Sequence, residues 1–255
     1  MKPIQLPTKI DDVILRLDEI ITHAKKIKSR TGYFASMYKR VTIEIKNKTE
    51  AGFFDNNERM RKLVVVFANR YLEAYYLFHE NGNCTSSWKV AFEATKKRTP
   101  LVLQHLILAL NAHIGLDLCV AAATICPGEE IIDLKNDFEK INTVLDSLVT
   151  IMRSELEKIW PVLKPVDFVG GKLEEKLTDF SIQKARDAAW KNALRFANTK
   201  KEEELQILLV ERDKHVSKFG KELHNPGLLF NWFLLLLRLF EIGDIKKKIA
   251  ALNRN

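Results

Sequence analysis

The sequence is poor in the residues that interrupt helices and cross-link small folds. Only 10 glycines, 7 prolines and 3 cysteines occur among 255 residues, which excludes collagen-like, low-complexity and disulfide-framework proteins. Cys84, Cys119 and Cys126 are odd in number and widely spaced, so we expect a reducing compartment. The first residues lack the apolar stretch of a signal peptide, and a cytoplasmic protein is therefore predicted.

Long apolar runs and blocks of one charge are also missing. The most membrane-like segment, 228–237, reads LLFNWFLLLL and meets Arg238, well short of the roughly 20 residues of a membrane span. We expect it to be a buried C-terminal helix. The net charge of +8 is spread along the chain, and neither a helix-turn-helix nor an aromatic and basic stripe occurs. We predict no membrane span and no nucleic-acid partner.

Strand patterns are absent, and helical patterns fill the chain. Apolar residues recur at three- and four-residue steps, as at Ile10, Ile14, Leu17 and Ile21, which is typical of amphipathic helices. The first helix is expected to end near Gly32. The patterns predict helices over 10–27, 34–48, 57–78, 86–97, 100–125, 131–160, 181–198, 202–221 and 226–252.

The chain reads as one domain. The only candidate linker, 161–171, carries Val162, Leu163, Val166, Phe168 and Val169, which a solvated tether would not need. No repeat of 30 to 50 residues indicates a solenoid. We therefore predict a single all-α domain over residues 1–255, a compact bundle of eight or nine helices around a buried central helix.

The range 100–125 is the expected central helix. From Leu101 to Ala123 it contains no Lys, Arg or Glu, so it should be enclosed by protein. Each polar residue within it costs free energy to bury unless it finds a partner or a ligand. These residues are Gln104, His105, Asn111, His113 and Asp117.

His113 and Asp117 are four residues apart and face the same side of the helix. This spacing predicts either half of a Zn, Fe or Mn site, completed from other helices, or a direct hydrogen bond in the core. His105 lies about 12 Å along the axis from His113, so the two serve different ions or opposite ends of one cavity. Gly115, between the pair, allows close approach of a ligand or of another helix.

Other polar residues are assigned to a ligand. Gln104 and Asn111 share a second stripe, roughly on the far side of the helix, and are predicted to bind a ligand. Trp190 and Arg70, which lie outside the central helix, are the other two candidate ligand-binding residues.

Arg186 and Trp190 are one turn apart, so a guanidinium and an indole could face a shared pocket; the alternative is a surface Arg packed over a half-buried Trp. Arg70 lies in a strongly apolar helix, where its charge is expected to be drawn inward. In the sequence, the nearest candidate counter-charge for Arg70 is Asp55. The alternative is that Asp55 only opens the N-terminal region of the same helix.

Common catalytic signatures are missing from the sequence. It contains no Gly-rich phosphate loop, no His-Glu-x-x-His, no Cys-x-x-Cys, no nucleophile elbow and no paired Glu-x-x-His. These absences exclude the well-known reaction classes that depend on such motifs.

Several motifs together resemble one known family. Residues 103–105 read LQH and residues 111–118 read NAHIGLDL, which resembles the core helix of an uncharacterised bacterial family of helical proteins, a domain of unknown function. That family reads L-Q-H-x-x-L-x-x-N-A-H-I-N-L-D-L, so Gly115 stands where it has Asn. Further matches are YKRVT at 38–42, GFFD at 52–55, FANRY at 67–71, WKVAF at 88–92 and RDAAW at 186–190. The resemblance implies a single helical domain and brings no activity.

The leading functional hypothesis is a metal-dependent enzyme acting on a small molecule. In it, His113 and Asp117 hold a divalent metal (Zn, Fe or Mn), His105 is a second ligand or acid–base group, and Arg186 holds an anionic substrate. One alternative is a non-catalytic binding protein for an apolar or haem-like ligand, with His105 as the axial contact. The other is a structural or interaction module whose polar residues fix helix register.

Overall fold

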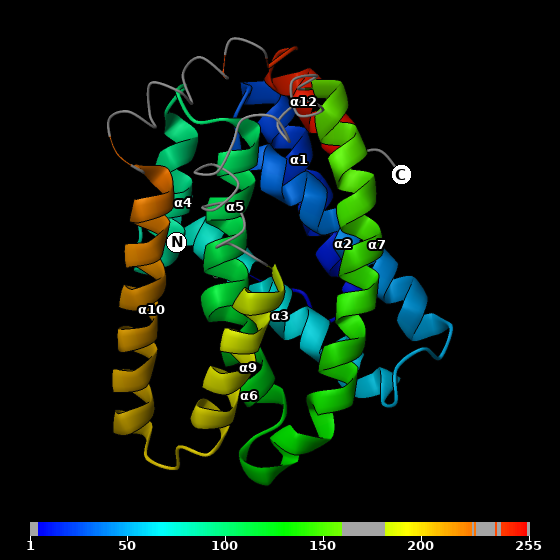
Figure 1. Ribbon diagram of the computed structural model, residues 1–255, viewed down its shortest axis with the longest axis vertical. Coiled ribbons are helices and arrows are strands. Elements are labelled where there is room, and N and C mark those ends of the chain that lie inside the picture. The colour runs from blue at the N-terminus through cyan, green and yellow to red at the C-terminus, as the bar shows by residue number, and fades with distance from the viewer. Residues whose placement is uncertain (1–4, 160–181, 226, 228–237, 239–240, 254–255) are drawn as a thin grey trace.

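The computed structural model describes residues 5–159, 182–225, 227, 238 and 241–253. Within these residues the chain forms nine helices and no strand (Figure 1), and the predicted all-α class is confirmed. Two sequence predictions, the candidate linker at 161–171 and the apolar segment 228–237, lie outside the described residues.

The first half of the chain forms four helices before the central one. They are α1 (Ile10–Ile27), α2 (Thr31–Glu50), α3 (Asn57–His79) and α4 (Ser86–Lys96). In α1, Ile10, Leu17 and Ile21 of the predicted apolar stripe are buried and Ile14 is partly exposed. The helix has acidic residues in its first turn and basic residues in its last, as the helix dipole favours. The helix ends where Lys28 adopts a left-handed conformation, with φ of 53°.

Gly32 does not lie at the end of the first helix, as expected, but inside the first turn of α2. A Cβ atom there would come within 2.8 Å of the Ala24 side chain and 2.6 Å of Ile249. The glycine therefore allows α1, α2 and the C-terminal helix to approach closely. Gly32 thus serves helix packing, and the expectation that it ends the first helix is wrong.

The central helix is continuous but not uniform. It comprises α5 (Val102–Ala112), a π-helical turn η1 (His113–Asp117) and α6 (Leu118–Ile125). All residues from 105 to 119 are buried except Leu110, which confirms the expected enclosure. By length and composition, the stretch Val102–Ile125 could cross a membrane, but 78% of its most apolar window is buried inside the protein, as in the core helix of a globular fold.

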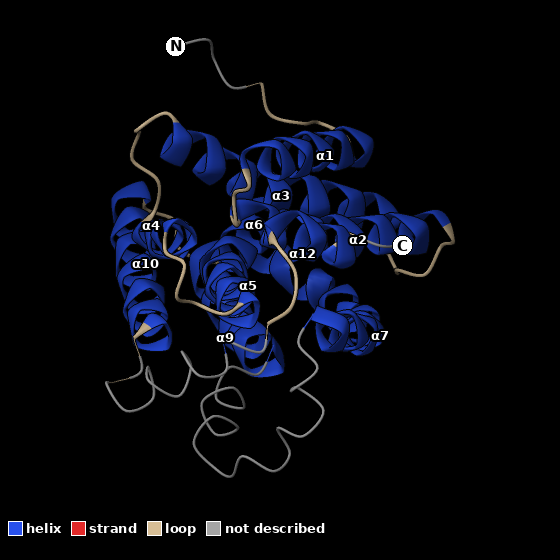
Figure 2. Ribbon diagram, turned by 90° about the horizontal axis from the view of Figure 1, so that it is seen from above, coloured by secondary structure: helices blue, strands red, loops and turns tan. Residues whose placement is uncertain are grey.

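Other helices surround this core. After the 3₁₀ turn η2 (Gly128–Leu134) come α7 (Lys135–Ile159), α9 (Ile182–Ala197), α10 (Glu202–His224) and α12 (Ile245–Leu252). Seen from above, α4 and α10 lie on one side of α5 and α2 lies on the other (Figure 2). Farther along the chain, α3 and α9 pack on α6. The polar residues of the central helix thus face several different neighbours.

One predicted helix is wrong in its extent. The range 226–252 was expected to be a single helix, but residues 241–244 are not helical and Gly243 has φ of 87°. The Asp244 side chain caps a separate helix, α12, by accepting a hydrogen bond from the Lys247 backbone N–H at 2.8 Å. A glycine followed by a good N-cap residue ends one segment and begins another.

Carboxylates from the second half of the chain cap helices of the first half. Asp137 accepts two backbone N–H groups just before α3, at 2.6 and 3.0 Å. Asp213 accepts the first two N–H groups of α4, at 2.7 and 2.9 Å. Glu241 accepts the first N–H group of α5, at 2.7 Å. Each carboxylate satisfies donors that a helix start leaves without partners.

Candidate functional site

Asp117, at the end of the π turn, is the centre of a buried polar network. Its side chain is 1% exposed. One oxygen, Oδ2, accepts hydrogen bonds from Trp88 Nε1 at 2.7 Å and from His113 Nδ1 at 3.1 Å. The other, Oδ1, accepts one from Arg70 Nε at 3.3 Å. Three donors and one positive charge therefore compensate the desolvation of this carboxylate.

His113 is held inside a cage of aromatic rings. Its ring stacks on Phe67, with centroids 3.6 Å apart and planes within 6°, and meets the edge of Tyr38 at 4.5 Å. Burial lowers the pKa of His113, against the opposing effect of the Asp117 hydrogen bond. The neutral ring donates Nδ1–H to Asp117, which leaves Nε2 as an acceptor. Nε2 has no hydrogen-bond partner among the described residues.

The π turn is tied to α10 on its other side. The carbonyl oxygen of Gly115 accepts a hydrogen bond from Arg212 Nε at 2.8 Å. A Cβ atom at Gly115 would lie 3.1 Å from both methyl groups of Val216, so of the two explanations for this glycine the structure favours close helix packing. Single π turns within α-helices are frequent at functional sites. Here the turn brings His113 and Asp117 into direct contact.

Arg70 finds a different counter-charge from the one predicted. Asp55 instead forms an ion pair with Lys140 and accepts a hydrogen bond from Asn136, while Arg70 pairs with Asp117, 47 residues away. The Arg70 side chain is 29% exposed. Its Nη groups donate to no acceptor among the described residues. One edge of this guanidinium is thus fixed in the core, and the other is free at the surface.

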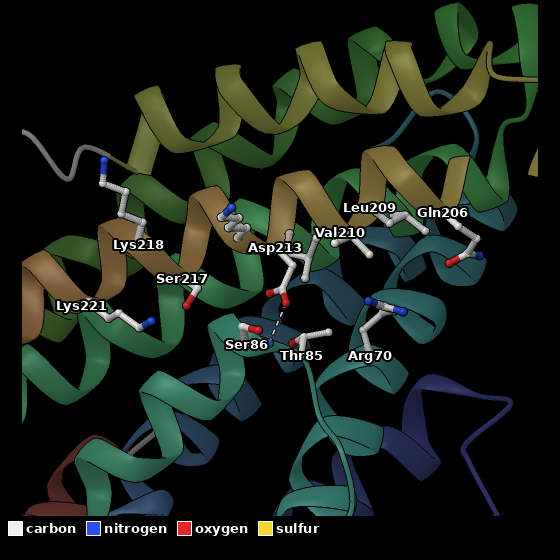
Figure 3. A pocket seen from close by; sticks show the side chains of 12 residues that line it. Arg70, Thr85, Ser86, Gln206, Leu209, Val210, Asp213, Ser217, Lys218 and Lys221 are labelled. Carbon is white, nitrogen blue, oxygen red and sulfur yellow. Dashed lines mark hydrogen bonds between the residues drawn. The ribbon is translucent and has the colours of Figure 1, made fainter. Parts of the chain in front are cut away.

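That free edge opens into a groove of about 790 Å³ between α3, α4 and α10. We call it the Arg70 groove. Figure 3 shows Arg70 at one end and Lys221 at the other, with Asp213 between them. The groove is lined by Arg70, Thr85, Ser86, Leu116, Gln206, Leu209, Val210, Asp213, Lys214, Ser217, Lys218 and Lys221.

Gln104 and Asn111, both predicted to bind a ligand, instead make internal hydrogen bonds. Gln104 Oε1 accepts the backbone N–H of Leu101 at 2.9 Å and so caps the start of α5. Asn111 Nδ2 donates to the carbonyl oxygen of Val216 at 2.9 Å, which anchors α10 against the central helix. Neither residue lines the Arg70 groove.

His105 lies apart from the His113 network. It is buried beside Tyr33, with ring centroids 5.8 Å apart, and neither ring nitrogen has a hydrogen-bond partner among the described residues. Burial, together with nearby positive charges, lowers the pKa of His105 to about 3. The ring is therefore neutral at pH 7.

Arg186 and Trp190 do lie close together, but within the core. The Arg186 guanidinium is 4.3 Å from the Phe138 ring centroid, donates to Asn142 Oδ1 at 2.5 Å and also donates to the Phe138 carbonyl. The Trp190 ring packs on the same Phe138, at 4.9 Å. Burial lowers the pKa of Arg186 to about 10. Arg186 thus donates to protein groups through Nε and Nη2, and neither residue lines the Arg70 groove.

A metal at His113 and Asp117 would need further ligands. Within the part of the chain that the structure describes, no group of three or more His, Cys, Asp or Glu residues is placed to hold a metal ion. Both oxygens of Asp117 are already engaged by nitrogen donors. The direct hydrogen bond, which is one of the two alternatives that the spacing predicted, is present.

The sequence interpretation missed Trp88 and the basic side of the groove. Trp88 is nearly fully buried and makes the shortest hydrogen bond to Asp117. Its signal was present in the WKVAF motif, which was noted only as a family resemblance. Lys214, Lys218 and Lys221 recur at three- and four-residue steps on α10, a pattern that also fits an ordinary solvated face.

The fold and the site define a class: an all-helical domain in which a buried carboxylate holds an arginine at the edge of a surface groove. The sequence model of a family of unknown function, DUF5995, matches residues 10–226, and the chain belongs to this family. Comparisons with curated proteins and with solved structures gave no match.

Proposed function

We propose that this protein binds a small anionic molecule in the Arg70 groove. The observation that carries the proposal is the position of Arg70, whose Nε is held by buried Asp117 while its Nη groups have no acceptor among the described residues and the side chain lines the groove. A guanidinium fixed in this way is preorganised for a carboxylate or phosphate, because its fork of donors matches two acceptor oxygens. Preorganisation also reduces the entropy lost on binding.

The charges around the groove favour an anion. Besides Arg70, three lysines line it (Lys214, Lys218 and Lys221), and Asp213 is the single acidic residue of the lining. Both oxygens of Asp213 already accept backbone N–H groups of α4, so this carboxylate is partly neutralised by the helix start. The surplus of positive charge raises the local concentration of anions.

The remaining lining gives the ligand a second property. Leu116, Leu209 and Val210 provide apolar wall. The uncharged polar groups of the lining are the Gln206 amide and the hydroxyl groups of Thr85, Ser86 and Ser217. Pockets that combine apolar surface with a few fixed polar groups suit small organic molecules. We therefore infer a ligand with an anionic head and an apolar body.

The described residues support binding better than metal-dependent catalysis. His113 and Asp117 are buried behind Arg70 and do not line the groove, so a ligand there does not touch them. Asp117 acts on the ligand through Arg70, as a positioning residue. The haem-like alternative has less support, because His105 lines neither this groove nor the neighbouring hollow between α4 and α10.

The test measures binding of decanoate, a carboxylate with an apolar chain, by calorimetry. Decyltrimethylammonium, with a similar chain and the opposite charge, is the ligand control. We expect decanoate to bind and the cation not to bind. Binding should also shift the NMR signal of the Trp88 indole N–H, because Trp88 and Arg70 share Asp117.

Variants identify the groove as the site. Arg70→Gln should weaken decanoate binding at least tenfold, and Lys218→Gln, which leaves the core network intact, about threefold. Lys191→Gln on α9, an exposed lysine outside the groove, should have no effect. Equal affinity for the two probes, or unchanged binding in both groove variants, would overturn the proposal.

A further inference from the structure

The Arg70 groove continues into a second hollow between α4 and α10. This hollow has a volume of about 400 Å³ and shares Ser86, Ser217 and Lys221 with the groove. In Figure 3, Lys221 lies at the end of the groove opposite Arg70. The other residues that line the second hollow are Lys89, Val90, Glu93, Ala94, Lys97 and His224. The two hollows together form one path along α10.

At the far end, two nitrogen groups face each other. Lys97 Nζ lies 3.1 Å from His224 Nε2. An ammonium only donates, so Nε2 must be the acceptor and the ring proton sits on Nδ1. Nδ1 is buried and has no hydrogen-bond partner among the described residues. Among the described residues, Lys97 therefore pairs with a neutral histidine and with no carboxylate.

Within the described part of the chain, no nearby carboxylate neutralises the positive charge of Lys97. Glu93, the single acidic residue of this hollow's lining, is paired with Lys96 at 2.8 Å. Lys89, Lys97 and Lys221 form no ion pair within the described part of the chain. The sequence that follows His224, residues 226–240, contains no Asp or Glu. Three lysines gathered in one lining attract an anion from solution.

We propose that Lys97, Lys221 and His224 form a second anion-binding site, which we call the distal subsite. Where the proposed function also holds, the path takes one molecule with two anionic groups. Asp213, which lines the Arg70 groove, and His224 are separated by about 16 Å along α10. Between the two ends the wall includes Val90 and Ala94. The ligand class is therefore an elongated molecule with an apolar body and carboxylate or phosphate groups at both ends.

The distal subsite has a pH dependence of known sign. Burial, with Lys97 adding to it, lowers the pKa of His224, so the free site holds a neutral ring at pH 7. The charged groups around it are Lys97, Lys221 and Lys89, with Glu93 paired elsewhere. The other titratable group nearby is His105, whose pKa is lowered in part by His224. An anion bound among the lysines favours the protonated His224 ring and raises its pKa. Anion affinity therefore increases as the pH falls.

The first experiment follows the His224 ring by NMR during titration with sulfate, which keeps its charge between pH 7.5 and 5.5. We expect sulfate to raise the pKa of His224 by about one unit, and its affinity to rise about fivefold over this range, below the tenfold limit that a one-unit shift sets. Lys97→Gln should weaken sulfate binding several-fold, with Lys191→Gln as the control. Lys97 is exposed, so its replacement leaves the core intact. A His224 titration that sulfate does not change would overturn the distal subsite.

The second experiment tests whether one molecule spans both ends. A series of α,ω-dicarboxylates of increasing chain length is compared with the monocarboxylates of the same length. We expect one length to bind at least tenfold tighter than its monocarboxylate, because the second contact becomes intramolecular. Lys97→Gln should remove this advantage and leave monocarboxylate binding unchanged. No advantage at any length would refute a two-headed ligand, while loss of decanoate binding alone would refute only the Arg70 groove.

Discussion

Two histidines on the same buried helix have opposite environments. His113 gives one ring nitrogen to Asp117 and stacks on Phe67, whereas both nitrogens of His105 are without partners among the described residues. Both rings are buried, and burial lowers the pKa of each. Only His113 belongs to a network that reaches the surface, through Arg70. Burial of a polar residue is therefore a weak sign of function unless its contacts lead to a place where a ligand can bind.

The largest effect should come from the acid at the centre of the His113 network. Asp117→Ala leaves Trp88, His113 and Arg70 without their acceptor, and removing one partner of a buried ion pair costs about 3–5 kcal/mol of stability. Urea unfolding of both proteins measures the difference. Glu73→Ala, which replaces an exposed acid in the middle of α3, is the control and should change stability by less than about 0.5 kcal/mol. A loss below about 1 kcal/mol for Asp117→Ala would mean that the network contributes little.

A smaller loss is expected for the histidine of the same network. His113→Leu keeps the buried volume approximately but removes the donor to Asp117, at a cost of about 1–3 kcal/mol. Because the two residues are in contact, the double variant with Asp117→Ala should lose less than the sum of the single losses, by at least about 0.5 kcal/mol. Additive losses in urea unfolding would show that the two side chains do not depend on each other.

The smallest effect at pH 7 is expected for the other histidine. His105→Leu removes no hydrogen bond and eliminates two unpaired buried nitrogens, so stability should stay the same or rise by up to about 1 kcal/mol. A loss as large as that of His113→Leu would remove the contrast between the two residues.

The effect of His105 on the free energy of unfolding should appear at low pH. Its pKa in the folded protein is about 3, below the ordinary value of 6.5, so protons bind preferentially to the unfolded chain. The stability associated with the neutral ring is complete above pH 6.5 and is lost as the pH falls toward 3, by up to about 1.4 kcal/mol per unit. Unfolding measured from pH 7 to 4 should show a shallower decline for His105→Leu than for the unmodified protein.

Local pattern was sufficient to predict the helices and the enclosure of the central one. The run without Lys, Arg or Glu between Leu101 and Ala123 can only be buried, and the four-residue spacing of His113 and Asp117 placed them on one face. The break at Gly243 was missed because apolar residues on both sides of it continue the pattern. A single glycine is weak evidence until its backbone conformation is known.

Partners far apart in the sequence could not be predicted. Arg70 was recognised as a charge drawn inward, but the choice between Asp55 and Asp117 depends on how α3 packs against the central helix. Asp213 gave no signal, because it contacts α4 across 126 and 127 residues. The groove itself is formed by three helices whose mutual positions are a property of the fold, and no spacing within one helix encodes it.

The carboxylate caps described above impose an order on synthesis and assembly. The capping carboxylates all follow the central helix in the sequence, at Asp137, Asp213 and Glu241. Each accepts N–H groups at the start of an earlier helix or of the central helix itself. A nascent chain that has just finished the central helix therefore has three helix starts with unpaired amides, and such long-range contacts slow folding. The two halves of the chain carry complementary parts of the same caps. If the chain were split between α6 and α7 and the two parts were expressed separately, the carboxylates of the second part would cap helices of the first part on reassembly.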